Sequence, residues 1–345
     1  MFVRRLAGVA AFAVALALGA IPAAAGPTAL TLINGWKPAP SGTAKPSVSL
    51  VRGIVHLRGA IWTKASNNSV VPFVVPAPFR PSTLVYFKTD MCNATNGRIY
   101  IQPDGTANVQ AENDAANAKC MTSLDGATYA VSPEGFKTLK LRHGWQPYSG
   151  GTGIPAARLI SGIVRFTGAM SSGGTNALPF IMPATQRPSA RVYVPVDTSG
   201  ATNGRLVIQT DGSVTVEGEF GLGSPSGFTS LEGVWYARDT AGFTPLSLIN
   251  GWTSSTSFTA TPGVQVINGV VHFQGAIQTG GNNAVPFVLP VGFRPVKNVF
   301  VTVDMCSATH GQIGITPDGT ATVMGENSFG NAACFTSLDG ASFHL

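Results

Sequence analysis

The chain has 345 residues, of which 44% are hydrophobic and only 11% are charged. Its 22 Lys and Arg residues outnumber its 16 Asp and Glu residues, but the charges are scattered and form no basic run of the kind that binds nucleic acid or a lipid surface. Gly, Ser, Thr, Asn, Val and Pro are abundant and helix-period segments are missing, so the composition predicts an all-β protein rich in turns.

The first residues have the pattern of an export signal. Arg4 and Arg5 precede an almost wholly apolar run over 6–21, and the small residues Ala23–Ala25 follow. We interpret residues 1–25 as a signal peptide of the general secretory route. A retained membrane anchor or a twin-arginine signal is the alternative, but the run ends in small residues and its flanks fit the twin-arginine motif poorly. We therefore expect a secreted, extracellular protein with no membrane contact after cleavage.

The rest of the sequence repeats three times. A proline-rich apolar stretch ends in Arg-Pro at Arg80, Arg187 and Arg294, and the arginines are 107 residues apart in both intervals. A period this regular predicts tandem copies of one unit. We predict three β-sandwich repeats of jelly-roll-like form, since a unit of about 107 residues can bury its own core. Their predicted bounds are 26–135, 136–242 and 243–345.

The first half of each repeat is predicted to contain a hairpin. In the first repeat, Gly35-Trp36 follows an apolar pair, and a polar loop leads to a strand over 53–61 with alternating apolar and polar residues. An Asn-rich tip then leads into the proline-rich stretch. We expect the strand before this tip and the proline-rich stretch after it to pair as a hairpin.

The second half of each repeat is predicted to contain shorter strands joined by tight turns. In the first repeat, Asn96-Gly97 and Asp104-Gly105 are the turn signals, and both recur in aligned form, as His310-Gly311 and Asp318-Gly319 in the third repeat. A closing motif of Thr-Ser-Leu-Asp/Glu-Gly leads into a last strand, over 122–129 in the first repeat. The expected total is seven or eight short strands per repeat.

The four cysteines have matched spacing. Cys92 and Cys120 are 28 residues apart, and so are Cys306 and Cys334. The middle repeat has Ser199 and Gly227 at the matching places, so both cysteines are absent there together. We predict the disulfides Cys92–Cys120 and Cys306–Cys334, which an oxidising compartment allows. Zinc is the alternative, but a zinc site needs four clustered ligands and the sequence has no Cys-x-x-Cys or close histidine pair.

Aligned charged residues are interpreted first as structural. Asp104, Asp211 and Asp318 belong to Asp-Gly turns, with calcium binding or acid catalysis as the alternative. Three aligned glutamates are expected to pair with the three Arg-Pro arginines, with catalysis as the alternative. They are Glu112, Glu219 and Glu326.

The aligned histidines and tryptophans are also interpreted first as structural residues. His56 and His272 align with Arg165 in the middle repeat, and we expect these positions to face the surface. Three aligned tryptophans could stack on sugars, but packing within or between units is the preferred interpretation. They are Trp36, Trp145 and Trp252.

The third repeat resembles a known group of domains. Gly269 to Gly275, Pro286 to Pro295, Asp318-Gly319 and Ser337 to Gly340 together look like the β-domains at the ends of phage tail fibres and receptor-binding proteins. The resemblance covers essentially the whole chain after the signal. It implies a β-domain that binds host surface glycans, formed in the fibres by three separate chains. Here three copies lie in one chain, with a signal peptide and cysteines, and no ligand residue of the group can be carried over.

The expected function is that of a secreted, non-catalytic binding or structural protein whose loop tips contact a glycan, a cell surface or a partner protein. The predicted binding residues are Asn67, Asn68, Asn282 and Asn283, because loops carry function on rigid β scaffolds. We expect no catalytic residue, no metal, no cofactor, no nucleic acid, and a monomer. A secreted hydrolase that acts on polysaccharide through two carboxylates is the alternative.

Assembly of the three repeats can also be predicted. Short linkers at 131–135 and 238–242 keep neighbouring units close, and equivalent surfaces recur three times. We expect the units to pack around a pseudo-threefold axis in one chain. A row of independent beads is the alternative.

Overall fold

The computed structural model describes residues 27–255 and 258–345, so the predicted signal peptide lies outside the described residues. Strands dominate these ranges. The helices found there are short: α1 (Ala115–Cys120), α2 (Gly223–Gly227) and α3 (Phe329–Cys334). No helix within the described ranges is long and apolar enough to cross a membrane. The all-β prediction is confirmed.

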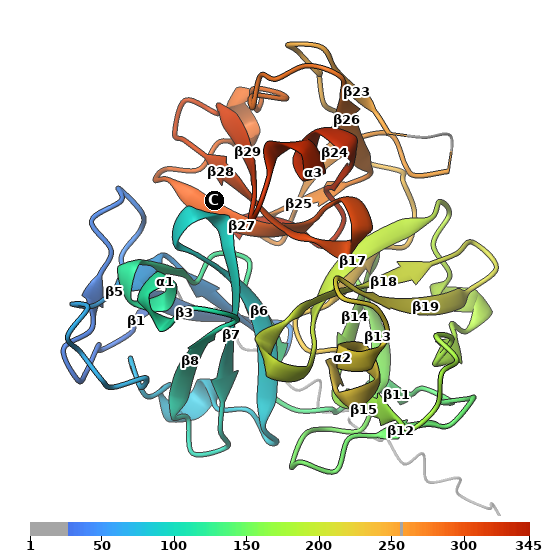
Figure 1. Ribbon diagram of the computed structural model, residues 1–345, viewed down its shortest axis with the longest axis horizontal. Helices are drawn as coiled ribbons and strands as arrows, with labels where there is room; N and C mark the ends of the chain where they lie inside the picture. The colour runs from blue at the N-terminus through green and yellow to red at the C-terminus, as the bar shows by residue number, and fades with distance from the viewer. Residues whose placement is uncertain (1–26, 256–257) are drawn as a thin grey trace, which may run out of the picture.

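The hydrophobic core is divided into three clusters, and the chain forms three lobes around a common centre (Figure 1). The clusters lie within residues 30–129, 139–236 and 246–343, and we call the parts of the chain that surround them lobes 1, 2 and 3. Each cluster falls inside one predicted repeat. The boundaries between repeats and the sandwich assignment stay predictions.

The strands follow the same order in the three lobes. Lobe 1 contains β1 (Thr28–Ala29), β2 (Lys37–Pro38), β3 (Ser47–Val51), β4 (Ile54–Arg58), β5 (Ala60–Trp62), β6 (Val85–Met91), β7 (Thr95–Ile101), β8 (Ala107–Ala111), β9 (Thr122–Ser123) and β10 (Thr128–Ala130). Lobe 2 contains β11 (Lys137–Thr138), β12 (Trp145–Pro147), β13 (Ala156–Ile160), β14 (Ile163–Thr167), β15 (Ala169–Ser172), β16 (Phe180–Ile181), β17 (Val192–Asp197), β18 (Asn203–Ile208), β19 (Ser213–Gly218), β20 (Thr229–Ser230) and β21 (Trp235–Ala237). Lobe 3 contains β22 (Thr244–Pro245), β23 (Trp252–Ser254), β24 (Gly263–Ile267), β25 (Val270–Gln274), β26 (Ala276–Thr279), β27 (Val299–Asp304), β28 (His310–Ile315), β29 (Ala321–Gly325), β30 (Thr336–Ser337) and β31 (Ser342–His344).

The sheets are antiparallel and equivalent from lobe to lobe. In lobe 2 the strand orders are β11-β13-β14-β21, β12-β15-β20 and β16-β19-β18-β17, and lobe 3 has β22-β24-β25-β31, β23-β26-β30 and β27-β28-β29. In lobe 1 the last two sheets join as β2-β5-β9-β6-β7-β8 through the pair Met91↔Thr122. The matching contacts in the other lobes are the isolated bridges Thr198↔Thr229 and Met305↔Thr336.

The strand predicted over 53–61 is divided at Gly59 into β4 and β5, which enter different sheets. Gly59 has φ +93°, and a Cβ there would collide with the carbonyl oxygen of Ala44. The Gly59 N–H donates to Asp125 Oδ1 at 2.9 Å. The carboxylate of the closing Leu-Asp-Gly motif therefore fixes the bend, a contact between distant residues that the alternation of one strand does not reveal.

The predicted hairpin with the proline-rich stretch is wrong. In lobe 1 this stretch makes the isolated bridges Leu32↔Phe73 and Val74↔Thr106, and in lobe 2 its strand β16 pairs with β19. The strand β4 instead forms a hairpin with β3, which lies in the segment expected to be a polar loop. The bend at Gly59 turns the chain away before the stretch begins, so the two segments cannot pair.

The predicted Asn-Gly turns are also wrong, although the observed turn is only about three residues away. Asn96 and Gly97 lie inside β7, and the turn is formed by Asn93 and Ala94, with φ +60° and +55°. Gly97 is required for another reason: a Cβ at this position would collide with Met91 Cε. Close side-chain packing across the hairpin, and not the turn, explains the glycine.

Both predicted disulfides, Cys92–Cys120 and Cys306–Cys334, are present. Each joins a short 3₁₀ turn, η2 (Cys92–Ala94) or η6 (Cys306–Ala308), to the last residue of α1 or α3. These helices have one or two turns, too short to show helical periodicity, which is why the sequence did not predict them. Asp114 and Ser328 cap α1 and α3 through their side chains.

The strands β6, β17 and β27 pack against one another in pairs at the centre of the molecule, which we call the central junction (Figure 1). Side chains along each of these strands point alternately to two sides. In β17, Val192, Val194 and Val196 lie in the core of lobe 2, and the residues between them face the neighbouring lobes. Equivalent hydrogen bonds join the lobes in a ring and give an approximate threefold arrangement. They are Ser123 Oγ to Phe300 O, Ser230 Oγ to Tyr86 O and Ser337 Oγ to Tyr193 O.

Replacing both Cys92 and Cys120 by Ser is expected to destabilise the protein by about 3–4 kcal/mol, because the disulfide closes a loop of this size in the unfolded chain. A guanidinium titration followed by tryptophan fluorescence measures the loss. Wild-type protein under reducing conditions loses both disulfides and should unfold at least as early as the double variant. An unchanged midpoint in the double variant would contradict this expectation.

Candidate functional site

A hollow with a volume of about 380 Å³ opens on the outer side of lobe 1. We call it the rim hollow. It is formed where the loop after β5 approaches the Gly-Trp turn near the start of the lobe. Its lining residues are Asn34, Gly35, Lys37, Trp62, Thr63, Lys64, Ser66 and Asn67.

Hydrogen bonds hold the loop beside the rim hollow in one shape. Asn67 Nδ2 donates to Asn34 O at 2.8 Å and to Thr63 Oγ1 at 2.7 Å, and Asn67 Oδ1 accepts from Ser69 N at 3.0 Å. Lys119 of α1 donates through Nζ to Ala65 O at 2.9 Å. The loop is therefore ordered before any ligand arrives, which lowers the entropy lost on binding.

Trp62 is the residue that makes this hollow different from its counterparts. It is partly exposed at the end of β5, opposite the exposed Lys37 of β2. The matching positions in the other lobes are Ser171 and Gln278. Sequence reasoning missed Trp62 because it compared only aligned tryptophans. A tryptophan present in one copy alone was the available signal.

The aligned tryptophans lie inside the lobes, as the preferred interpretation held. Trp36, Trp145 and Trp252 are 5%, 5% and 3% exposed. Their indole Nε1 atoms donate to backbone carbonyl oxygens of the following loop, at Ser69, Asn176 and Asn283. They anchor the loop tips and present no face to a sugar.

The four predicted binding asparagines have unequal roles. Asn67 lines the rim hollow and shapes its loop, whereas Asn283 accepts from Val285 N through Oδ1 at 2.9 Å and shapes the matching loop of lobe 3. Asn68 and Asn282 are exposed. The two pairs stand on different lobes, so the structure does not bring the four residues into one site.

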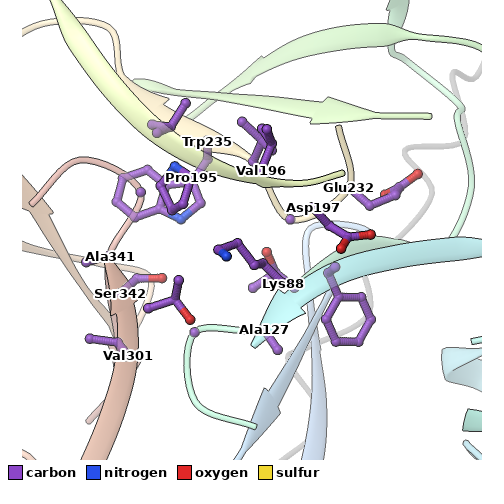
Figure 2. Close-up of a pocket in the computed structure, with 18 of the residues that line it drawn as sticks. Lys88, Ala127, Pro195, Val196, Asp197, Glu232, Trp235, Val301, Ala341 and Ser342 are labelled. Atoms are coloured by element: carbon purple, nitrogen blue, oxygen red, sulfur yellow. The ribbon is translucent and has the colours of Figure 1, made fainter. Parts of the chain in front are cut away.

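A second polar region lies at the central junction. Figure 2 shows Lys88 extending into a chamber between the lobes, with Pro195, Asp197 and Trp235 of lobe 2 and Val301 and Ser342 of lobe 3 around it. The chamber has a volume of about 40 Å³. This is room for a few water molecules at most, so the chamber cannot hold a glycan.

Polar pairs cross from each lobe to the next at the junction, and two of them are ion pairs. Arg98 Nη1 donates to Asp197 Oδ2 at 3.1 Å, and Arg205 Nη1 donates to Asp304 Oδ2 at the same distance. The third pair is of another kind: His310 Nε2 of lobe 3 lies 3.4 Å from Asp90 Oδ1 of lobe 1. Burial raises the pKa of Asp197 to about 6 and that of Asp304 to about 7, against the lowering effect of the arginines.

Three glutamates meet beside these pairs. Glu112, Glu219 and Glu326 bring carboxylate oxygens within 4.8 Å of one another, a geometry that could hold a metal ion. Asn96 joins two of them, since its Nδ2 donates to Glu112 Oε2 at 2.8 Å and its backbone N–H to Glu326 Oε1 at 3.1 Å. Lys88 donates to Asn96 Oδ1 and supplies a positive charge near the glutamates.

The glutamates do not pair with the Arg-Pro arginines, so that expectation is wrong. Each arginine folds back and donates through Nε to a carbonyl oxygen five residues earlier, at 2.8–3.2 Å. The acceptors are Val75, Met182 and Leu289. The arginine is held locally by its own turn, whereas the glutamate points to the junction between lobes.

The aligned aspartates shape turns, as interpreted. Asp104 Oδ1 accepts from Thr106 N, Asp211 Oδ1 from Ser213 N and Asp318 Oδ1 from Thr320 N. Hydrogen bonds lower the pKa of all three carboxyls, chiefly from backbone N–H groups at Asp104 and Asp211 and from the Thr316 hydroxyl at Asp318.

The surface position expected for His56, Arg165 and His272 is wrong. They are 4%, 8% and 1% exposed, because β4, β14 and β25 are covered on both faces. The alternation of one strand cannot distinguish a face that meets water from a face that meets another lobe.

No protein-family model, no curated protein and no solved structure matches this chain. The two polar regions are therefore interpreted from their own geometry. The rim hollow has the size, the exposure and the mixed aromatic and polar lining of a ligand site. The central junction joins the lobes.

Arg98→Met is expected to destabilise the protein by about 3–5 kcal/mol at pH 8, because it leaves Asp197 buried without its partner. The pKa of Asp197 in the folded protein, about 6, is already above its ordinary value of 3.8. The stability that a raised carboxyl pKa contributes is present below the ordinary value and is lost as pH rises through the folded value. The loss in the variant should therefore be larger at pH 8 than at pH 5.

The double variant Arg98→Met with Asp197→Asn is the matched control for this measurement. It removes the charge that needs a partner, so urea titrations should show recovered stability at pH 8 and a weaker dependence on pH. Equal stability of Arg98→Met and wild type at pH 8 would mean that the pair does not stabilise the junction.

Proposed function

We propose that this is a secreted, non-catalytic protein that binds glycans through the rim hollow of lobe 1. The observation that carries the proposal is the partly exposed Trp62 in a hollow lined by amide, hydroxyl and ammonium groups. The face of an indole packs on the C–H surface of a sugar ring, and polar groups around it pair with the hydroxyls.

The lining favours a neutral or acidic sugar. Lys37 and Lys64 are exposed beside Trp62, and none of the residues lining the hollow is acidic. Lysine ammonium groups donate hydrogen bonds to hydroxyls, carboxylates or sulfates alike. The resemblance to the receptor-binding ends of phage tail fibres supports the same class of ligand. The two disulfides and the export signal support an extracellular location.

Trp62→Ala is expected to weaken binding at least about tenfold, since a partly buried aromatic residue is a common binding hot spot. The glycan with the highest signal on a glycan array serves as the probe, and isothermal titration calorimetry gives the affinity. Gln278→Ala, at the matching position of lobe 3, is the control and should bind like wild type. Both variants should keep the wild-type melting temperature. Equal affinity of Trp62→Ala and wild type would refute the role of the rim hollow.

A secreted hydrolase is the second candidate, and one observation favours it. Burial, with the neighbouring Glu112 and Glu326, raises the pKa of Glu219 to about 7, which is suitable for a general acid. Against it, none of the three glutamates lines the rim hollow or the central chamber. A panel of chromogenic glycosides separates the two functions. Turnover by wild type that is lost in Glu219→Gln would establish the hydrolase, and no turnover by either is expected.

A further inference from the structure

A cluster of basic side chains is buried where the β4, β14 and β25 strands meet. In β14, Val164 and Phe166 lie in the core of lobe 2, so Ile163 and Arg165 face the neighbouring lobes. The same alternation in β4 and β25 places His56 and His272 beside Arg165. Arg165 Nη2 lies 3.3 Å from His272 Nε2, and a small cavity borders all three side chains.

The hydrogen bonds fix the protonation state of His272. A guanidinium only donates, so His272 Nε2 accepts from Arg165, and its proton is on Nδ1, 3.1 Å from Val270 O. His272 is therefore neutral. Burial, followed by the charge of Arg165, lowers the pKa of both His272 and His56, so His56 is neutral too. Neither imidazole competes with Arg165 for an anion or repels the guanidinium.

Arg165 has no counter-ion among the described residues. Its single hydrogen bond is the one to His272, and no described carboxylate lies within ion-pair distance. Arginine stays protonated at neutral pH, and its other N–H donors have no partner in the described part of the chain. Arg165 is only 8% exposed, and a largely buried charge without a counter-ion destabilises a fold, so a negative charge in the adjoining cavity would stabilise the assembled chain.

We propose that the cavity beside Arg165 binds one small monatomic anion of the halide class, which is the counter-ion of the guanidinium at the junction of the three lobes. The cavity has a volume of about 20 Å³, room for about one water-sized particle. This is too small for a sugar or for a tetrahedral oxyanion such as sulfate. Ile54, Ile163 and Val270 form an apolar part of the wall, which favours a weakly hydrated ion.

The binding site needs all three lobes, because His56, Arg165 and His272 come from one lobe each. An anion there would stabilise the assembled junction and not a separate lobe. Arg142, an exposed arginine of lobe 2 that does not line this cavity, provides a control for non-specific electrostatic effects.

Two measurements on the full chain test the proposal. Crystals soaked in bromide should give an anomalous scattering peak beside Arg165. In solution, the melting temperature of wild type should be about 2–3 °C higher in sodium bromide than in sodium gluconate of equal ionic strength, because the bound ion stabilises only the folded state. The difference should vanish in Arg165→Met and persist in Arg142→Gln.

Other outcomes would overturn the proposal. No anomalous peak together with equal melting temperatures in the two salts means that the cavity holds water, and the proposal fails. A peak with no difference in melting temperature means an adventitious ion only, which also overturns it. If Arg165→Met does not fold, the wild-type comparison and Arg142→Gln still decide, because loss of the salt difference in Arg142→Gln would assign the effect to surface charge.

Discussion

The structure depends on the burial of one aspartate from each lobe at the central junction. Asp90, Asp197 and Asp304 are at most 2% exposed, and each faces a basic side chain or a histidine from the lobe that follows or precedes it around the ring. A buried carboxyl group is much less costly when it has such a partner than when it stands alone. The pairs therefore fix which surfaces of the lobes meet, while the alternation of β6, β17 and β27 supplies the apolar contacts that hold the lobes together.

Having three lobes in one chain lets the residues at corresponding positions near the centre differ. Lys88 has Pro195 and Thr302 as counterparts, and Arg165 has His56 and His272. In a symmetric trimer of identical chains, either cation would occur three times around the axis, and like charges at close range repel. A single chain can place one cation there, with neutral residues at the other two positions. Joining the three lobes in one chain therefore avoids the repulsion between like charges at the centre.

The centre and the rim of the molecule differ in structure and have different roles. The junction is buried, its chamber is small and its polar groups bind one another, so it serves assembly. The rim hollow is open, and its loop is held from behind by Lys119 and by hydrogen bonds of Asn67. Loops on a rigid scaffold can vary without loss of the fold. Trp62 illustrates this, since Ser171 and Gln278 occupy the same strand position in the other lobes.

The all-β class, the disulfides and the Asp-Gly turns could be predicted because each follows from nearby residues: a strand alternates by itself, Asp104 bonds two residues onward, and paired cysteines keep their spacing. The bend at Gly59 needs Asp125, and Gly97 needs Met91, so their roles depend on contacts across a sheet. The turn and hairpin that the sequence predicted there were wrong for that reason.

The candidate site was predicted only in part. Asn67 could be predicted because it lies in an Asn-rich tip. Trp62 becomes part of a site only in the folded chain, where β5 places it beside the Gly-Trp turn. His56, Arg165, His272 and the three glutamates were interpreted as surface or local residues, although they meet at contacts between lobes. The sequence alone determined the all-β class and the alternation of residues along each strand, and it predicted three equivalent surfaces. Only the tertiary structure decided which of those surfaces face one another, because that depends on packing between residues about a hundred positions apart.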